Sequence, residues 1–222
     1  MANLVILRHG KSLWNIEHRF TGTVDIKLSP VGVKEAEDAA DRLRDMKFDA
    51  AFTSSLSRAK DTLQIMLGKN NQLHTHIKVN KALNPNYLGD LEGQKKEDLV
   101  EKFGASKVRC WQKSYSATPP NGESLLDISN RIIDFYEKEV IPLLKQKKNV
   151  LLVAHGNSLR ALMMYLESLT PESTKNLNLP TAQPILYKLV SMQIPEPAEE
   201  EVLPSDIQDI REYMVVSEKV YV

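Results

Sequence analysis

Two stretches of this 222-residue chain repeat one pattern, an aliphatic run followed by His-Gly-x-Ser-Leu, at residues 3–13 and 149–159. The histidines of these stretches are His9 and His155. An imidazole is a competent nucleophile toward phosphorus at neutral pH, because a pKa of about 6.5 leaves much of it unprotonated. A lone histidine is most often a structural side chain, but the repetition of the motif favours a functional role for both.

Two arginines accompany these histidines and suit the binding of a phosphoryl group. Arg8 adjoins His9, and Arg58 follows another predicted strand at the same edge of the sheet. A guanidinium binds phosphate oxygens in a bidentate manner, which an ammonium does not do, and phosphoryl transfer needs positive groups around the transferred oxygens. We therefore predict a catalytic site of His9, His155, Arg8 and Arg58, in which His155 donates a hydrogen bond to the transferring group.

The elements that position these residues alternate between strands and helices. Apolar runs without alternation at 3–7 and 149–154 predict strands buried on both faces of a parallel sheet. His9 and His155 then lie at the carboxyl ends of central strands, where open α/β sheets bind their ligands. The glycine after each histidine lets the backbone turn toward a helix. The alternation predicts a three-layer α/β/α sandwich with a mostly parallel central sheet.

The remaining elements follow from caps, apolar spacing and turn residues. We predict helices from Ser29-Pro30 through Leu43, over 56–67 with an end at Gly68, over 95–103, over 123–148 as one long helix, and from the second His-Gly pair through 169. Strands are predicted at 49–53, 77–79 and 184–190, with a possible edge strand at 213–216, and residues 83–93 and 104–122 are expected to be irregular. The expected organisation is one domain over 1–222, with a mobile, acidic, proline-containing tail segment at about 192–212.

Composition and charge narrow the classes of protein. Basic and acidic residues number 29 each, which argues against a general nucleic-acid or membrane-surface binder. The single cysteine, Cys110, excludes an internal disulfide and suits a reducing cytosol. No stretch approaches the roughly 18 apolar residues of a membrane span, and the first residues do not resemble a signal peptide, so a cytoplasmic location is expected. Without a cysteine cluster or a His-Glu-x-x-His motif, we predict no metal site.

Further motifs resemble those of a known family. The segments 7–12, 14–15, 19–22 and 54–59 read Leu-Arg-His-Gly-Lys-Ser, Trp-Asn, Arg-Phe-Thr-Gly and Ser-Ser-Leu-Ser-Arg-Ala, and they resemble the histidine phosphatase superfamily. Ala-His-Gly-Asn-Ser-Leu-Arg at 154–160 and Asn-Leu-Pro-Thr at 178–181 narrow the resemblance to the cofactor-dependent phosphoglycerate mutases. The likeness runs from about residue 3 to 190, and its motifs are specific in order and spacing.

The resemblance implies a mutase that interconverts 3- and 2-phosphoglycerate in glycolysis and gluconeogenesis. Such an enzyme is primed by 2,3-bisphosphoglycerate, needs no metal, and carries the phosphoryl group on a histidine, here His9. Arg8, Arg58 and His155 would hold that group. Substrate-binding positions carried over from the family are Asn15, Thr21, Gly22, Lys96, Lys113, Gly156 and Asn157. The partner is then a small phosphorylated metabolite, with no nucleic acid or membrane, and a homodimer is possible because family members often dimerise.

The chain departs from the family where the mutases keep their general acid and base. The expected glutamate is replaced by Pro85, and the arginine and tyrosine that contact substrate are replaced by Asn86 and Leu88. A later arginine pair reads Gln-Lys at 112–113. Proline cannot transfer a proton, so Asp90 or Glu92 in the same loop are the candidates to take over that role.

Three hypotheses follow. The first is a phosphoglycerate mutase with relocated acid chemistry. The second is a phosphatase of the same superfamily, in which water accepts the phosphoryl group from a small phosphate ester. The third is a catalytically weak relative that keeps a phosphate-binding site, because no carboxylate reaches the reacting oxygen.

Overall fold

A six-stranded sheet forms the centre of the computed structural model, which describes residues 2–193 and 212–222. The strands lie in the order β3-β2-β4-β1-β5-β6. Their bounds are Ala2–Arg8 (β1), Ala50–Thr53 (β2), His76–Val79 (β3), Asn149–Ala154 (β4), Ile185–Gln193 (β5) and Glu212–Tyr221 (β6). The pairings from β3 through β1 are parallel, while β5 and β6 are antiparallel to their neighbours. The sheet is therefore mixed, with a parallel half that carries both His-Gly strands.

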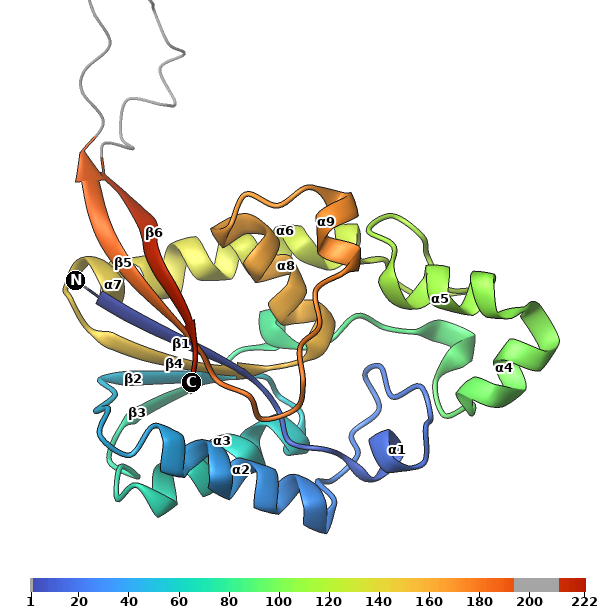
Figure 1. Ribbon diagram of the computed structural model, residues 1–222, viewed down its shortest axis with the longest axis horizontal. Coiled ribbons are helices and arrows are strands. Elements are labelled where there is room, and N and C mark those ends of the chain that lie inside the picture. Colours follow the sequence, from blue (N-terminus) through green and yellow to red (C-terminus); the bar gives the residue numbers. More distant parts are fainter. Residues whose placement is uncertain (1, 194–211) are drawn as a thin grey trace, which may run out of the picture.

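Helices cover both faces of this sheet, which confirms the predicted three-layer α/β/α sandwich (Figure 1). Helices α2 (Pro30–Arg42) and α3 (Ser57–Lys69) lie on one face, and α6 (Leu125–Phe135) and α8 (Gly156–Leu166) lie on the other. The side chains of successive β1 residues pack alternately on the two faces of the sheet. Leu4 and Ile6 pack with α6 and α8, whereas Val5 and Leu7 pack with α2 and α3. This two-sided burial explains why the strand sequence is apolar throughout.

Local signals predicted some boundaries and missed others. Ser29 caps α2 by accepting a hydrogen bond from the Gly32 N–H at 3.0 Å, and Pro30 begins the helix as predicted. Gly68 does not end α3, which continues to Lys69 and is capped by Asn70. The prediction there was wrong because glycine costs a helix only about 1 kcal/mol, which packing readily offsets.

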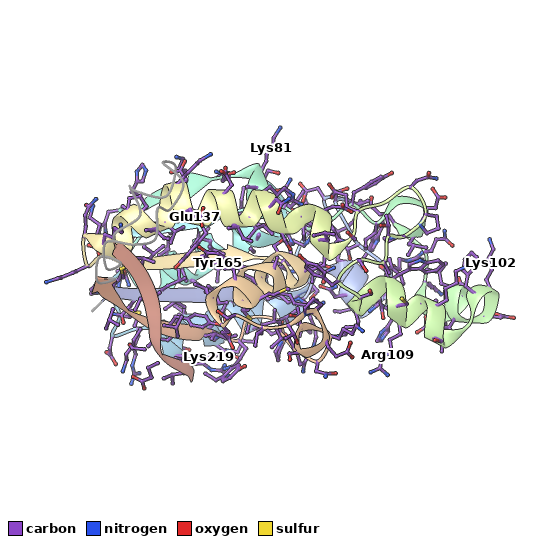
Figure 2. The ribbon with its side chains drawn as sticks, turned by 90° about the horizontal axis from the view of Figure 1, so that it is seen from above. Lys81, Lys102, Arg109, Glu137, Tyr165 and Lys219 are labelled. Carbon is purple, nitrogen blue, oxygen red and sulfur yellow. The ribbon has the colours of Figure 1, made fainter. Side chains whose placement is uncertain are left out.

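The region 104–122, predicted to be irregular, contains the helix α5 (Ala105–Lys113). Its buried face consists of Val108 and Trp111, which join a small apolar cluster with Phe20, Leu91 and Leu99. Two buried residues three apart give too weak a periodic pattern to be read in the sequence. With α4 (Lys96–Phe103), α5 extends beyond the end of the sheet where β1 and β4 finish (Figure 1). Lys102 and Arg109 lie on this extension (Figure 2).

The predicted long helix over 123–148 is divided. Helix α6 passes into a π-turn at Tyr136–Val140, and α7 follows at Ile141–Lys145. Pro142 lacks an N–H and interrupts the regular ladder of hydrogen bonds, which accounts for the widened turn before it. The helix predicted from the second His-Gly pair through 169 was also too long. Helix α8 ends at Leu166, and a separate short helix, α9 (Pro171–Lys175), follows with Thr170 as its cap.

A 3-10 turn at Lys81–Leu83 leads into the loop predicted at 83–93, and a second one, at Gly89–Leu91, lies within it. A single helical turn, α1, spans Leu13–Ile16. The predicted edge strand at 213–216 is confirmed and belongs to the longer β6. The predicted mobile tail lies almost entirely at residues 194–211, outside the described residues. No helix in the described ranges is long and apolar enough to cross a membrane.

Candidate active site

A cavity of about 260 Å³ lies at the carboxyl ends of β1 and β4 and gathers the predicted site residues. All four predicted catalytic residues and all seven predicted substrate-binding residues line it. The lining consists of Arg8, His9, Asn15, Arg19, Phe20, Thr21, Gly22, Arg58, Pro85, Asn86, Leu88, Lys96, Gln112, Lys113, His155, Gly156, Asn157 and Arg160. Six of these side chains are arginine or lysine and none is acidic, so the described walls of the cavity suit an anion with more than one charge.

The two histidines face each other because their strands are parallel neighbours in matching register. Arg8 lies opposite Ala154 in the parallel register of β1 and β4, and the His9 N–H donates to the Ala154 carbonyl at 3.0 Å. The imidazole ring centroids are 5.0 Å apart, with an angle of 60° between the ring planes. His9 is 4% exposed and His155 is 2% exposed. Two locally similar strand ends therefore deliver both rings to one buried site.

The hydrogen bond of His9 determines which of its nitrogens is free to react. Its Nδ1 lies 2.7 Å from the Gly10 carbonyl oxygen, which can only accept, so Nδ1 carries the proton. Burial, together with the positive charges of Arg58 and Arg8, holds the pKa of His9 well below its ordinary value. The ring is therefore neutral near pH 7, with the lone pair on Nε2.

His155 is arranged as a hydrogen-bond donor. Its Nε2 lies 2.7 Å from the Ser54 Oγ, and that oxygen accepts a hydrogen bond from the Leu56 N–H at 3.3 Å. The Ser54 hydroxyl can therefore give its proton to Nε2, which places the proton of the neutral ring on Nδ1. Nδ1 is buried and has no partner in the described parts of the chain. An oxygen of a bound phosphoryl group would satisfy it.

Because His9 and His155 are buried, the free energy of unfolding should depend on pH. The pKa of His155 is also held well below its ordinary value, first by burial and then by the charges of His9 and the nearby arginines. Above about pH 6.5 both rings are neutral whether the chain is folded or unfolded, whereas below it the unfolded chain binds protons that the folded protein does not. We expect the free energy of unfolding to fall as the pH drops from 6.5 toward 5, by up to about 1.4 kcal/mol per pH unit for each histidine.

Urea unfolding at pH 5, 6, 7 and 8 measures this slope. The matched variant is His155→Gln, which cannot take up a proton and should reduce the dependence between pH 6.5 and 5 to the contribution of His9. A slope that is the same in both proteins would contradict the buried, neutral state assigned to His155.

Arg58 is held by the loop that contains the predicted phosphate-binding residues. Its Nη1 donates to the Val24 carbonyl and its Nη2 to the Gly22 carbonyl, both at 2.8 Å. The side chain is 1% exposed, and burial lowers its pKa to about 10. Its Nε has no hydrogen-bond partner within the described residues. The loop therefore orients a guanidinium that still has donors for a ligand.

Arg8, the last residue of β1, is held in a similar way by the loop that precedes β5. Its Nη1 donates to the Leu179 carbonyl at 2.8 Å, and its Nε is buried without a partner among residues 2–193 and 212–222. Gly156 lies beside it, since a Cβ at that position would stand 3.7 Å from the Arg8 Nε. The amino-terminal residue of α8 therefore lies in van der Waals range of the guanidinium.

The two candidate acids do not line the cavity. Asp90 is exposed, and its carboxylate accepts hydrogen bonds from the Asn121 Nδ2 at 3.1 and 3.2 Å. Glu92 accepts from the Thr23 N–H at 2.6 Å and from the Leu88 N–H at 3.1 Å, so it braces the loop around Gly22 from outside. The structure therefore gives no support to the prediction that one of them replaces the missing glutamate, because both are engaged elsewhere.

Pro85 occupies the cavity wall where the relatives' glutamate was expected. Its carbonyl accepts a hydrogen bond from the Arg131 Nη2 at 3.1 Å, and Arg131 also donates to the Asn84 carbonyl at 2.8 Å. The Asn84 side chain accepts from the Ser55 N–H at 3.0 Å. These hydrogen bonds fix the position of the loop. At position 85 a proline ring lines the cavity in place of the expected carboxylate.

Sequence reasoning missed several residues of the site. Arg160 and Arg19 line the cavity, Ser54 orients His155, and Arg131 braces the loop at Pro85. Arg160 carried a readable signal, because it lies four residues after Gly156 and three after Asn157 in a predicted helix, which places it on the same face. The roles of Ser54 and Arg131 depend on contacts between distant segments and have no local signature. Within the described residues, no group of three or more His, Cys, Asp or Glu side chains is arranged to hold a metal ion.

Comparison with known proteins agrees with this geometry. The sequence pattern of the histidine phosphatase superfamily (branch 1) matches residues 4–189. A protein from Cytophaga hutchinsonii named 2,3-bisphosphoglycerate-dependent phosphoglycerate mutase is 48% identical over 193 residues, which cover 86% of this chain and 89% of the relative. A phosphoglycerate mutase from Schizosaccharomyces pombe is 45% identical, with coverage of 84% and 89%.

Solved structures show the same fold. The crystal structure of the alpha-ribazole phosphatase from Shigella flexneri superposes with a TM-score of 0.72 at 25% identity, covering 85% of this chain and 91% of that one. Fold, site and sequence thus point to the same group of proteins. The chain belongs to the histidine phosphatase superfamily and, within it, to the family of 2,3-bisphosphoglycerate-dependent phosphoglycerate mutases.

Proposed function

We propose that this protein transfers a phosphoryl group through His9 and interconverts 3- and 2-phosphoglycerate, with 2,3-bisphosphoglycerate as the priming donor. The observation that carries the proposal is the neutral His9 with its lone pair on Nε2, facing His155 and surrounded by cations. The names of the relatives supply the substrate class and the donor.

The geometry supports a simple sequence of steps. The Nε2 of His9 attacks phosphorus, the N–P bond forms as the bond to the donor's ester oxygen breaks, and the electron pair leaves with that oxygen. Arg8, Arg58 and the Nδ1–H of His155 face the oxygens of the transferred group, where they stabilise the negative charge. In the return step a hydroxyl oxygen of phosphoglycerate attacks the phosphohistidine and restores the free His9.

The proton transfers at the ester and hydroxyl oxygens need an acid and base that the described lining of the cavity does not supply. The family resemblance assigns these transfers to a glutamate, and none of the described residues that line this cavity carries a carboxylate. This observation favours a second candidate function, a phosphatase in which water attacks the phosphohistidine. A third, a weak phosphate-binding relative, follows if neither acceptor is activated.

One assay separates these functions. The protein is incubated with 2,3-bisphosphoglycerate and 3-phosphoglycerate, and 2-phosphoglycerate and free phosphate are followed together. A mutase forms 2-phosphoglycerate faster than free phosphate, and a phosphatase forms free phosphate alone. If neither product appears, the proposed activity is wrong and the binding function replaces it.

Arg58→Ala is expected to weaken the binding of vanadate, which mimics the transferred phosphoryl group. A charge-assisted contact in a buried site is worth about 1.5–3 kcal/mol, whereas an exposed ion pair is worth about 0–1 kcal/mol. The matched control is Arg44→Ala, since Arg44 is exposed and pairs with Asp45 at 3.8 Å. Calorimetry that gives equal vanadate affinities for both variants would remove Arg58 from the phosphoryl site.

A further inference from the structure

The loop at 83–93 contributes three residues to the lining of the cavity, namely Pro85, Asn86 and Leu88, and none of them is an acid. Asn86 is 3% exposed, and both ends of its amide are used. Its Oδ1 accepts a hydrogen bond from the Asn157 Nδ2 at 2.8 Å, and the Oδ1 of Asn157 in turn holds the Arg160 Nη1 at 2.7 Å. The Asn86 Nδ2 donates to the backbone carbonyl of residue 123 at 2.9 Å. The wall that this loop forms therefore has no group that gives a proton to a leaving oxygen.

Three carboxylates lie at this loop, and hydrogen bonds hold each of them outside the lining of the cavity. Asp90 and Glu92 are engaged by the contacts given above. The third is that of Glu123, whose Oε2 accepts a hydrogen bond from the Tyr87 N–H at 2.8 Å and lies 3.9 Å from the Arg131 Nη2. A carboxylate reaches the cavity only if the loop gives up one of these contacts.

The loop has little freedom to do so, because it is fixed at Asn84. The Asn84 carbonyl accepts hydrogen bonds from the Ser158 Oγ at 3.0 Å and from the Arg131 Nη1 at 2.8 Å. The Asn84 Oδ1 accepts from the Ser55 N–H at 3.0 Å. Segments from three parts of the chain thus hold the residue next to Pro85.

The titratable groups of the described lining are the two histidines, the arginines and the lysines. A neutral imidazole is a very weak acid, and the ordinary pKa values of lysine and arginine are about 10 or higher. A general acid works best with a pKa near the operating pH, so these groups stabilise charge better than they donate protons. Burial lowers the pKa of Lys96 and of Lys113, which makes these two the alternative acids to test.

Without an acid, the leaving oxygen of a phosphoryl donor departs as an anion. The conjugate acids of the possible leaving groups differ widely in pKa, from about 4 for a carboxylate and about 10 for a phenolate to about 15.7 for hydroxide, which an aliphatic alkoxide resembles. Acyl and aryl phosphates therefore release a stable anion, whereas an alkyl ester such as 2,3-bisphosphoglycerate releases a strongly basic one.

We propose that this site takes phosphoryl groups preferentially from acyl phosphates and aryl phosphates, because Pro85 leaves the departing oxygen without a proton donor. The His9 Nε2 forms the N–P bond, the P–O bond breaks, and the electron pair stays on the carboxylate or phenolate oxygen, which takes up no proton. By microscopic reversibility, return of the group to water or to an aliphatic hydroxyl, which must release a proton to solvent, is slow, so phosphohistidine accumulates. The inference rests on the proposed function, because it concerns the donor for the same phosphohistidine.

The test compares 4-nitrophenyl, phenyl and benzyl phosphate, which share a ring but release increasingly basic oxygens. With enzyme in excess, rapid quenching measures the release of the alcohol in the first turnover. We expect the wild-type rate to fall steeply along this series. In Pro85→Glu the ratio of the phenyl to the benzyl rate should be smaller than in wild type by about ten- to a hundredfold. Acetyl phosphate carrying labelled phosphorus should label the wild type in a rapid burst.

Lys96→Gln and Lys113→Gln are the controls for the alternative acids. Each should leave the ratio of the phenyl to the benzyl rate as large as in wild type. A lysine variant with a larger ratio would show that this lysine donates the proton, and a ratio that is equal in wild type and Pro85→Glu would show that position 85 is irrelevant to the donor. Either result overturns the inference. If Pro85→Glu does not fold, the wild type decides, since benzyl phosphate that reacts as fast as phenyl phosphate also overturns it.

The inference and the proposed function can fail independently. A wild type that forms 2-phosphoglycerate from 2,3-bisphosphoglycerate and 3-phosphoglycerate as fast as it releases acetate from acetyl phosphate would confirm the proposed function and overturn the inference. A wild type that is labelled by acetyl phosphate at His9 but forms no 2-phosphoglycerate would overturn the mutase function and support the inferred donor class.

Discussion

His9→Ala is expected to abolish phosphoryl transfer and the covalent intermediate. Removal of a nucleophile that works as part of a unit costs roughly 10⁴- to 10⁶-fold in turnover. Among the residues that the structure describes, no second nucleophile lies at the same place, since the Nε2 of His155 is hydrogen-bonded to Ser54 and its Nδ1 carries a proton in the arrangement assigned here. The expected result is therefore a protein that binds phosphate but does not become phosphorylated.

The measurement is the phosphate bound after incubation with labelled 2,3-bisphosphoglycerate. A phosphohistidine is labile in acid and stable in base, so the wild type should lose its label only in acid. His74→Ala is the matched control, because His74 is exposed and is not among the residues that line the cavity. A label that survives His9→Ala would show that the nucleophile is a different residue.

Pro85→Glu is expected to raise the rate of phosphoryl transfer. Pro85 lines the cavity at the position where the family resemblance predicts the acid and base, and no described lining residue carries a carboxylate. A positioned acid or base contributes about 10²- to 10⁴-fold, so a gain of about ten- to a hundredfold is the realistic part of that range. The gain is limited because proline fixes φ and the loop is already held by Arg131 through the carbonyl of Pro85.

Asp90→Asn and Glu92→Gln, each in the wild-type background, complete this experiment. Asp90→Asn should leave activity unchanged, since the Asp90 carboxylate contacts Asn121 at the surface. Glu92→Gln should lower phosphate affinity by loosening the loop at Thr23, without changing the pH profile of the reaction. If either substitution removes a pKa from the profile, that carboxylate carries the proton. If Pro85→Glu has no effect and the wild type is nearly inactive, the protein is a phosphate-binding relative.

The sequence by itself determined the parts of this protein that depend on local rules. An unbroken apolar run predicts a buried strand, and the glycine after each histidine permits the turn into a helix, so His9 and His155 were placed at strand ends correctly. The matching register of β1 and β4 then brings both rings to one level of the sheet. The motif at 54–59 and the position carried over from the family at Lys96 predicted two of the cations that line the cavity.

Only the tertiary structure decided how the remaining residues act. The sequence shows that residue 92 is a glutamate, but not what its carboxylate contacts. In the fold it accepts a hydrogen bond from the Thr23 N–H, 69 positions away, and so stabilises the loop around Gly22 and Thr23 and does not enter the cavity as an acid. The contact of Asn86 with Asn157 spans 71 positions and gives Arg160 its place in the cavity. The physical reason is the same in both cases. The chemistry of a polar side chain depends on which donors and charges surround it after folding, and residues distant in the chain supply them.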